Sequence, residues 1–302
     1  MRKLVREARE KGAKGMVLDL AVNGGGSLED AVRIAGLFFK TGNVVKQSVK
    51  DPDQEELVLD DVDPAVDWSL PLVVLTSRIS ASASEIVAGT LKDYQRAVIV
   101  GGDHTFGKGS VQQVVPIPGL GALKVTVGMF FTPGGYSTQH RGVEGDIVLP
   151  GPFSTKDVGE KSLDYSLPPR KIAAFKSEDA YVSEGSDAWM KVDGKAIETL
   201  RTKSVARVAK SDEFKKIQKD LKKIGPKGKI FKLEEAFNDA KEKKSEKDQK
   251  KSLSAEEKIA EYLKRADLNE AENVLVDLIE YQNKVAIKLG SKGKGSPQAE
   301  RD

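Results

Sequence analysis

The chain has 302 residues, of which 39% are hydrophobic and 31% charged, with a formal net charge of +3. This length allows one large domain or two modest ones, and the hydrophobic content is sufficient for a buried core. Disulfide bonds, thiol catalysis and cysteine-based metal sites are excluded because the chain has no cysteine. No run of about 18 apolar residues occurs, so no membrane span is expected.

The N-terminal part predicts a helix, a strand, a glycine loop and a second helix. Residues 1–12 form a charged amphipathic helix without the apolar region of a signal peptide, so the chain as written is expected to stay in the cytoplasm. Residues 15–20 are typical of a buried, central strand of a parallel sheet. The glycines at 24–26 follow, and a helix is expected between residues 28 and 38. The loop has the geometry of an anion cradle, but its spacing matches neither a phosphate loop nor a dinucleotide fingerprint.

The middle of the chain reads as short strands. They are expected at residues 43–50, 55–59, 70–75 and 97–100, with an Asp-Pro-Asp turn at residues 51–53. A hairpin is expected from residues 112–118 and 122–131 across Gly119-Leu120-Gly121. Mixed helices and strands of this kind indicate an α/β protein.

The chain becomes helical and Lys-rich from about residue 186. Helices are expected at residues 193–211, 212–224, 255–265 and 268–289, with an extended piece at 227–233, an exposed or flexible segment at 241–251 and a disordered tail from about 290. The last helix carries an apolar stripe that favours a core role over a cofactor face: Val274, Leu275, Leu278, Ile279 and Tyr281. Residues 201–250 hold 17 Lys and Arg against 9 Asp and Glu. Mixed signs and few aromatics there favour solvated helix faces over nucleic-acid binding.

The stretch from residue 80 to 113 contains the candidate chemistry. It reads SASASEIVAGTLKDYQRAVIVGGDHTFGKGSVQQ, and Glu85 lies three residues after Ser82, which is the spacing of a capping box. A helix is therefore expected to begin at about Ser82. A serine at a helix start and Lys108 between two glycines allow a Ser-Lys dyad, because burial can lower the pKa of a lysine until it acts as a base. The alternative is an ordinary helix cap and a solvated turn.

The chain has only two histidines, His104 and His140, so a catalytic triad with histidine or a histidine-rich metal site is poorly supported. His140 is expected in a surface loop. His104 lies near the Gly-Lys-Gly turn but is also expected to face solvent, so neither residue is assigned a catalytic role.

The order of these motifs resembles the signature of the C-terminal processing peptidases, also called tail-specific proteases. The resemblance rests on SASASEIVAG, KDYQRAVIVG and TFGKGSVQQ. It implies that Ser82 is the nucleophile, that Lys108 is the general base and that Gln112 supports the lysine. One extra residue precedes Lys108 relative to the family, so the choice of Ser82 over Ser84 depends on aligning the serine run.

A second motif of the family also has a counterpart here. DLAVNGGG at residues 19–26 resembles the DLRxNxGG motif, with Ala21 in place of the Arg. The resemblance implies an oxyanion hole made by the amides of Gly25 and Ala83. Any ion pair that the family's Arg makes is expected to be lost, since alanine has no hydrogen-bonding side chain. Residues 134–147 resemble the family segment that closes the core, with Gly145 in place of Pro.

The resemblance is strongest over residues 12–169, and it also implies an architecture. It implies an α/β spiral core of β-β-α units, of the crotonase or Clp-protease type, followed by a mainly α-helical C-terminal domain. The expected domains are residues 1–172 and 173–302. Family members carry an N-terminal domain and a PDZ domain upstream, and a PDZ domain captures a peptide by adding it to a sheet. The chain is therefore expected to be truncated, with substrate delivery impaired.

The leading functional expectation is a serine endopeptidase that cleaves proteins near apolar C-terminal tails. The alternative is a catalytically silent or delivery-impaired fragment that acts as a binding or scaffold protein. An acyl-CoA enzyme is a third possibility, against which the Gly-Lys-Gly signature argues. No cofactor and no metal are implied. The expected partners are protein or peptide substrates with apolar C-termini and an adaptor or a second copy, but no nucleic acid. The family implies the periplasm or cell envelope.

Overall fold

The computed structural model describes residues 1–49, 56–223 and 254–292. The turn expected at residues 51–53, the extended piece at 227–233 and the segment at 241–251 lie outside the described residues. So does the expected tail, apart from residues 290–292, which end the last helix.

A parallel sheet forms one half of the core. Its order is β1-β4-β5-β8, formed by β1 (Met16–Asp19), β4 (Leu72–Thr76), β5 (Val98–Gly101) and β8 (Ile147–Val148). The prediction of a central position for residues 15–20 was wrong, because β1 lies at the edge. Its two faces are both covered: Met16 and Leu18 pack against one hydrophobic cluster and Val17 against the other. A run of apolar residues therefore indicates that both faces of a strand are covered, but it does not indicate that the strand has a neighbour on each side.

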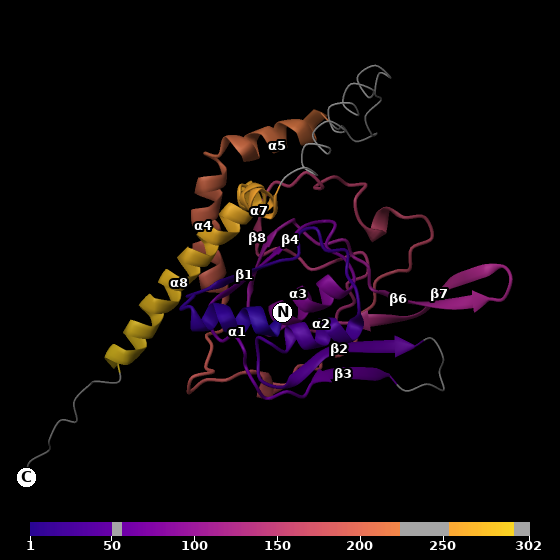
Figure 1. Ribbon diagram of the computed structural model, residues 1–302, viewed down its shortest axis with the longest axis horizontal. Coiled ribbons are helices and arrows are strands. Elements are labelled where there is room, and N and C mark those ends of the chain that lie inside the picture. Colours follow the sequence, from indigo (N-terminus) through magenta and orange to yellow (C-terminus); the bar gives the residue numbers. More distant parts are fainter. Residues whose placement is uncertain (50–55, 224–253, 293–302) are drawn as a thin grey trace, which may run out of the picture.

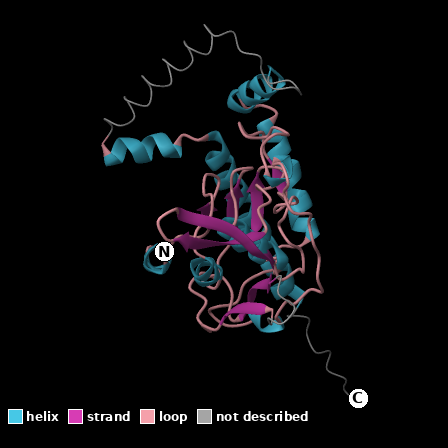
Figure 2. Cartoon of the chain, turned by 90° about the vertical axis from the view of Figure 1, so that its right-hand side faces the viewer, coloured by secondary structure: helices cyan, strands magenta, loops and turns pink. Residues whose placement is uncertain are grey.

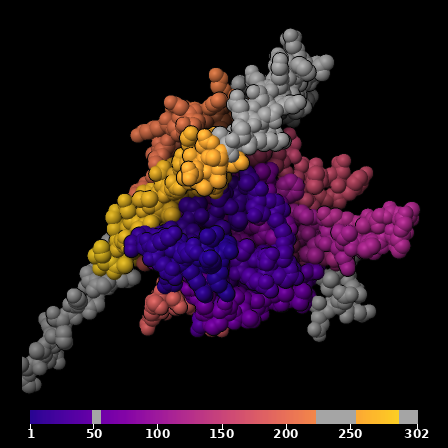
Figure 3. Space-filling model, viewed as in Figure 1, coloured from indigo at the N-terminus to yellow at the C-terminus, as the bar shows by residue number. Residues whose placement is uncertain are grey.

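An antiparallel sheet forms the other half. Its order is β3-β2-β7-β6, formed by β2 (Gly42–Val49), β3 (Leu57–Asp61), β6 (Ser110–Ile117) and β7 (Gly121–Phe131). The hairpin of β6 and β7 is confirmed, with Gly119 at φ 75° in its turn. Figures 1 and 3 show this hairpin projecting from the body of the molecule. Leu120 at its tip is 86% exposed.

Helices cover the sheets, and Figure 2 shows them beside the strands on more than one side. They are α1 (Arg2–Glu10), α2 (Leu28–Ala35), α3 (Ala83–Asp93), α4 (Gly194–Val208), α5 (Asp212–Lys223), α7 (Ala255–Leu263) and α8 (Ala266–Lys292). Short 3₁₀ turns occur at Glu160–Ser162 and Glu178–Ala180. No described helix is long and apolar enough to cross a bilayer.

The C-terminal helices share a core with the parallel sheet. Leu200 of α4 and Val274 and Leu278 of α8 are fully buried in one cluster with Val73 and Val98 of the sheet. The predicted buried stripe of the last helix is thus confirmed at its centre. The α/β class, with a helical C-terminal region, agrees with the prediction, whereas the expected boundary between residues 172 and 173 stays a prediction.

Candidate active site

Ser82 occupies the junction between strand β4 and helix α3. It is the N-cap of α3 and has φ 58°, a left-handed conformation that is uncommon for a residue with a side chain. Such strained backbone at a helix start turns a side chain out of the local fold and is common at functional sites. Ser82 is half-buried, and its Oγ donates to no acceptor among the residues that the structure describes.

The flanking serines have structural contacts instead. Ser80 Oγ donates to the carbonyl of Leu20 at 2.7 Å, and Ser80 is fully buried. Ser84 Oγ lies 3.0 Å from the carbonyl oxygen and 2.9 Å from Oδ1 of Asn23, and Ser84 is only 4% exposed. In the serine run, Ser82 is therefore the residue whose hydroxyl proton stays available.

Glu85 joins the serine elbow to the lysine loop. Its side chain is fully buried, and its Oε2 accepts the N–H of Ser82 at 2.8 Å and that of Lys108 at 2.9 Å. Its Oε1 accepts the N–H of Gly107 at 2.7 Å and the hydroxyl of Thr105 at 2.5 Å. One carboxylate thus holds two segments of chain in register.

The charge of Glu85 reflects opposing effects. Burial raises the pKa of this carboxyl to about 7, while the four donors around it act in the opposite direction. Three of the four partners are backbone N–H groups that can only donate, so a proton on the carboxyl could be accepted among them only by the Thr105 hydroxyl. From about neutral pH upward, Glu85 is therefore held as a carboxylate.

Lys108 lies between two glycines, Gly107 and Gly109, at positions where the loop leaves no room or conformational freedom for a side chain. Gly107 has φ 89°, and a Cβ on Gly109 would lie 2.6 Å from the backbone nitrogen of Gln139. Gln139 Oε1 also accepts the N–H of Gly109 at 2.9 Å. Close backbone approach thus fixes the path of the loop, and Lys108 is the side chain that this path presents.

The amine of Lys108 has two acceptors. Its Nζ donates to Ser110 Oγ at 3.1 Å and to Gln112 Oε1 at 3.0 Å. Burial lowers the pKa of Lys108, which favours the neutral amine that a general base requires, although Glu160 and Glu85 act in the opposite direction. Gln112 is itself exposed and donates weakly to Thr126 across the hairpin at 3.5 Å.

The structure brings Ser82, Lys108 and Gln112 into one region but does not bond the first two. Among the described residues, Lys108 Nζ donates to Ser110 and Gln112 and not to Ser82. Catalytic hydrogen bonds are often long before substrate binds and tighten afterwards, so this arrangement remains compatible with a dyad.

The glycine loop packs directly against the serine elbow. Gly25 has φ 105°, and a Cβ there would lie 2.8 Å from Ser82 Cβ and 3.1 Å from the nitrogen of Ala83. The Gly25 N–H donates to Asn23 Oδ1 at 2.9 Å. Ala83 is the first residue of α3, whose first-turn N–H groups have no partner within the helix. Of the two predicted oxyanion donors, Ala83 is open and Gly25 is engaged.

The histidines lie to the side of this arrangement. His104 is half-buried, with its Nδ1 2.6 Å from the carbonyl oxygen of Thr105, and His140 is half-buried, with its Nε2 2.8 Å from Ser166 Oγ. Within the described ranges, no cluster of three or more His, Asp or Glu residues is arranged to hold a metal ion.

Sequence reasoning missed several residues of the site: Thr105, Ser110 and Gln139. It identified Glu85 only as a helix cap. Its second role depends on Gly107 and Lys108, which follow it by 22 and 23 residues. The sequence carries no signal of this second role, because the burial of Glu85 and its partners in the lysine loop appear only in the folded chain.

Comparison with known proteins matches two parts of the chain to protein families. Residues 1–149 match the model of peptidase family S41, and residues 156–292 match a family of unknown function, DUF6483. The tail-specific protease of Haemophilus influenzae is 36% identical over 230 residues, which are 74% of this chain and 32% of that protein. The carboxy-terminal-processing protease of Bartonella bacilliformis is 41% identical over 147 residues, 48% of this chain and 33% of that protein.

Among solved structures, the photosystem II D1 C-terminal processing protease is 36% identical and covers 49% of this chain and 38% of its own, with a TM-score of 0.45. The chain spans about a third of the length of the two curated relatives named above. Through residues 1–149, the chain belongs to peptidase family S41, the family of the tail-specific and C-terminal processing proteases.

Proposed function

We propose that the chain carries a serine endopeptidase site with a Ser82-Lys108 dyad. The observation that carries this proposal is the arrangement around Glu85, which ties the backbone of Ser82 and of Lys108 to one carboxylate. The lysine amine is held by Gln112 and has a lowered pKa. An available hydroxyl and a base that favours its neutral form are the two requirements of this chemistry.

The proposed reaction begins with attack of Ser82 Oγ on a peptide carbonyl carbon. The hydroxyl proton moves to neutral Lys108 Nζ, and the carbonyl oxygen becomes an oxyanion that the Ala83 N–H stabilises. The intermediate then collapses, the C–N bond breaks, and the leaving amine takes the proton from Lys108. Water then attacks the acyl-serine carbonyl carbon and gives a proton to Lys108. The bond from the carbonyl carbon to Ser82 Oγ breaks, Lys108 returns the proton to Oγ, and the carboxylic acid is released.

Gly25 is the proposed second oxyanion donor, in which case its N–H must leave Asn23 Oδ1 when substrate binds. The other glycines of the loop, Gly24 and Gly26, have open space around them. A second candidate function is a binding protein that keeps the peptidase fold without its activity. Two observations favour it: Gly25 needs a local rearrangement, and Ser82 and Lys108 are not hydrogen-bonded to each other.

A preference for apolar tails is supported by a pocket beside the dyad. The cavity has a volume of about 400 Å³ and is lined by residues of β2 and β7 and of the loop that follows the core: Ser48, Thr126, Val127, Gly128, Met129, Leu167, Pro168 and Arg170. Thr126 faces Gln112 across the hairpin, so the pocket lies next to the lysine. Its largely apolar walls suit an aliphatic side chain of a substrate.

A fluorophosphonate probe tests the proposal, because it reacts only with an activated serine. The wild-type chain is expected to be labelled, and Ser82→Ala and Lys108→Ala are expected to lose the label while keeping their circular-dichroism spectra. Ser84→Ala is the matched control and keeps the label, since its buried hydroxyl only anchors Asn23. A folded wild-type chain that is not labelled would overturn the peptidase proposal and favour the binding-protein alternative. Cleavage of peptides with an apolar or an acidic C-terminus then tests the preference.

A further inference from the structure

Asp19 connects the end of β1 with the C-terminal helices. Its Oδ1 accepts the N–H of Ala21 at 2.8 Å, at the start of the glycine loop. Its Oδ2 accepts the hydroxyl of Tyr262 and Nη1 of Arg265, each at 2.6 Å. Tyr262 belongs to α7, and Arg265 precedes α8 directly. One carboxylate therefore joins the strand, the loop that follows it and the α7–α8 junction.

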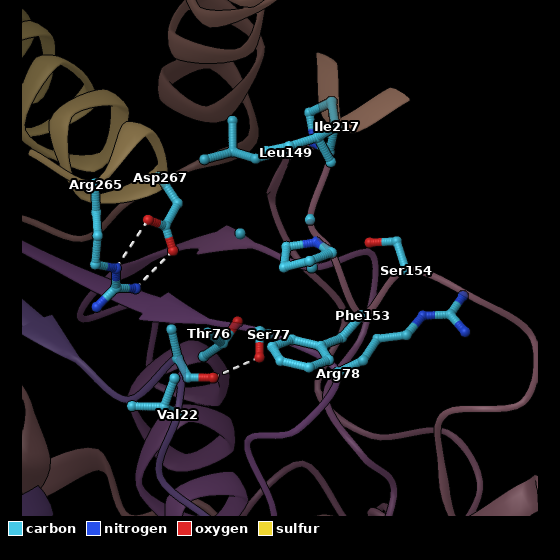
Figure 4. Close-up of a pocket in the computed structure, with 16 residues that line it drawn as sticks. Val22, Thr76, Ser77, Arg78, Leu149, Phe153, Ser154, Ile217, Arg265 and Asp267 are labelled. Carbon is cyan, nitrogen blue, oxygen red and sulfur yellow. Dashed lines mark hydrogen bonds and ion pairs between the residues drawn. The ribbon is translucent and has the colours of Figure 1, made fainter. Parts of the chain in front are cut away.

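Arg265 is fixed in a single orientation. Its Nε and Nη2 donate to the two carboxylate oxygens of Asp267 at 3.1 Å and 2.6 Å, and its guanidinium carbon lies 5.2 Å from the ring centroid of Tyr262. Figure 4 shows the pairing of Arg265 with Asp267 at one side of a pocket. A planar fork that binds two carboxylates and stacks on a ring is a rigid anchor. The Asp19 side chain is only 12% exposed, which limits screening by solvent.

The start of the glycine loop is held by two side chains: Asp19 Oδ1 accepts the N–H of Ala21, and Ser77 Oγ donates to the Ala21 carbonyl oxygen. Of these two contacts, the one through Asp19 leads to the C-terminal helices. Ala21 is 2% exposed and has no polar side-chain atom. It lines the same pocket as Arg265, a cavity of about 140 Å³ between the sheet edge and the helical region. Further along, Gly25 packs on Ser82 so closely that an added Cβ would lie 2.8 Å from Ser82 Cβ. A shift of the loop start would therefore move Gly25 against the nucleophile.

We propose that Arg265 and Tyr262 are positioning residues that hold the glycine loop through Asp19. In this arrangement the C-terminal helical region supplies, from the far end of the chain, the cationic anchor that position 21 lacks. The helical region is then part of the machinery that places the loop against Ser82, and not only a cover for the sheet. The catalytic consequence rests on the proposed function, whereas the structural consequence does not.

The test uses the full chain and two readouts. The first is the rate at which the fluorophosphonate probe phosphonylates Ser82, with fluoride as the leaving group, resolved into probe binding and the bond-forming step. The second is amide hydrogen exchange over residues 20–26, which reports opening of the loop whether or not the serine reacts. The variants are Arg265→Ala and Tyr262→Phe. Arg207→Ala is the matched control, because Arg207 binds Glu270 and Asp277 of α8 and does not reach Asp19.

In Arg265→Ala we expect the bond-forming step to slow about tenfold or more with probe binding unchanged, as for loss of an oriented oxyanion donor. Exchange over residues 20–26 should accelerate about tenfold, whereas Arg207→Ala should match the wild type in both readouts. Adding Ala21→Arg to Arg265→Ala should restore both, because the new guanidinium starts in the same pocket.

Equal losses in Arg265→Ala and Arg207→Ala would overturn the proposal, since both would then report general loosening of α8. Unchanged exchange over residues 20–26 in Arg265→Ala would overturn it as well. If the wild-type chain is folded but unlabelled, the protease assignment fails, and the exchange measurement alone decides whether Arg265 holds the loop.

Discussion

Replacing Glu85 by glutamine changes one atom in the most connected side chain of the site. The carboxylate accepts four donors, two at each oxygen. In the Glu85→Gln variant the amide nitrogen takes the place of one oxygen. At the Oε2 position it faces two backbone N–H groups, and at the Oε1 position it faces the Gly107 N–H while the Thr105 hydroxyl can turn to accept from it, so at least one backbone donor is left without an acceptor. A buried donor without an acceptor costs about 1–3 kcal/mol. The free energy of unfolding should therefore fall by about 1–3 kcal/mol.

Urea denaturation followed by circular dichroism measures this loss, and fluorophosphonate labelling should slow by about tenfold or more because the Lys108 loop is displaced from Ser82. Glu144→Gln is the control: this carboxylate is more than half exposed and pairs only with Arg141, a contact worth about 0–1 kcal/mol. If the free energy of unfolding of the Glu85→Gln variant lies within about 1 kcal/mol of the wild-type value, and the variant is labelled at the same rate, then Glu85 does not tie the two segments together.

Two further predictions concern the ionisation of the site and the glycine loop. The rate at which the fluorophosphonate labels Ser82 should rise with pH in two steps. The first step lies near pH 7, as Glu85 loses its proton, and the second lies at the lowered pKa of Lys108, because only the neutral amine accepts a proton. Labelling rates from about pH 6 to about pH 10 measure these steps, and a flat profile contradicts the role of Lys108. Gly25→Ala should slow labelling of Ser82 by about tenfold or more, since the new Cβ would lie 2.7 Å from the carbonyl oxygen of Ala81 at a backbone conformation that disfavours side chains. Gly24→Ala is the control and should label like the wild type, because a Cβ on Gly24 would have no atom within 4 Å. Equal rates in the two variants would refute the close packing of Gly25.

The parts of the fold that depend on local chemistry could be predicted from the sequence. The spacing of Ser82 and Glu85 predicted the start of α3 because a capping box needs only neighbouring residues. The Gly-Leu-Gly turn predicted the hairpin because its backbone requires glycine. The edge position of β1 could not be predicted, because its apolar residues record two covered faces and say nothing about strand neighbours.

The parts of the site that depend on distant contacts could not be predicted. Arg265 binds Asp19 across 246 positions of sequence, and no local pattern marks either residue as a partner of the other. The same holds for Glu85, whose capping spacing concealed its contacts with the lysine loop. The serine and the lysine themselves were found because the residue types required for the chemistry stand in recognisable motifs.

The two halves of the proposed dyad belong to different sheets. Ser82 follows β4 of the parallel sheet, whereas Lys108 leads into β6 of the antiparallel sheet, and the two sheets share no strand. The distance between hydroxyl and amine therefore depends on how the two sheets pack, as well as on Glu85, which binds the backbone of both segments. The projecting β6–β7 hairpin extends directly from the lysine loop (Figure 1), so the lysine lies at the base of an exposed element. A molecule that binds the hairpin tip would therefore contact the strand pair into which the lysine leads, whereas the serine lies at the start of a helix that follows the parallel sheet.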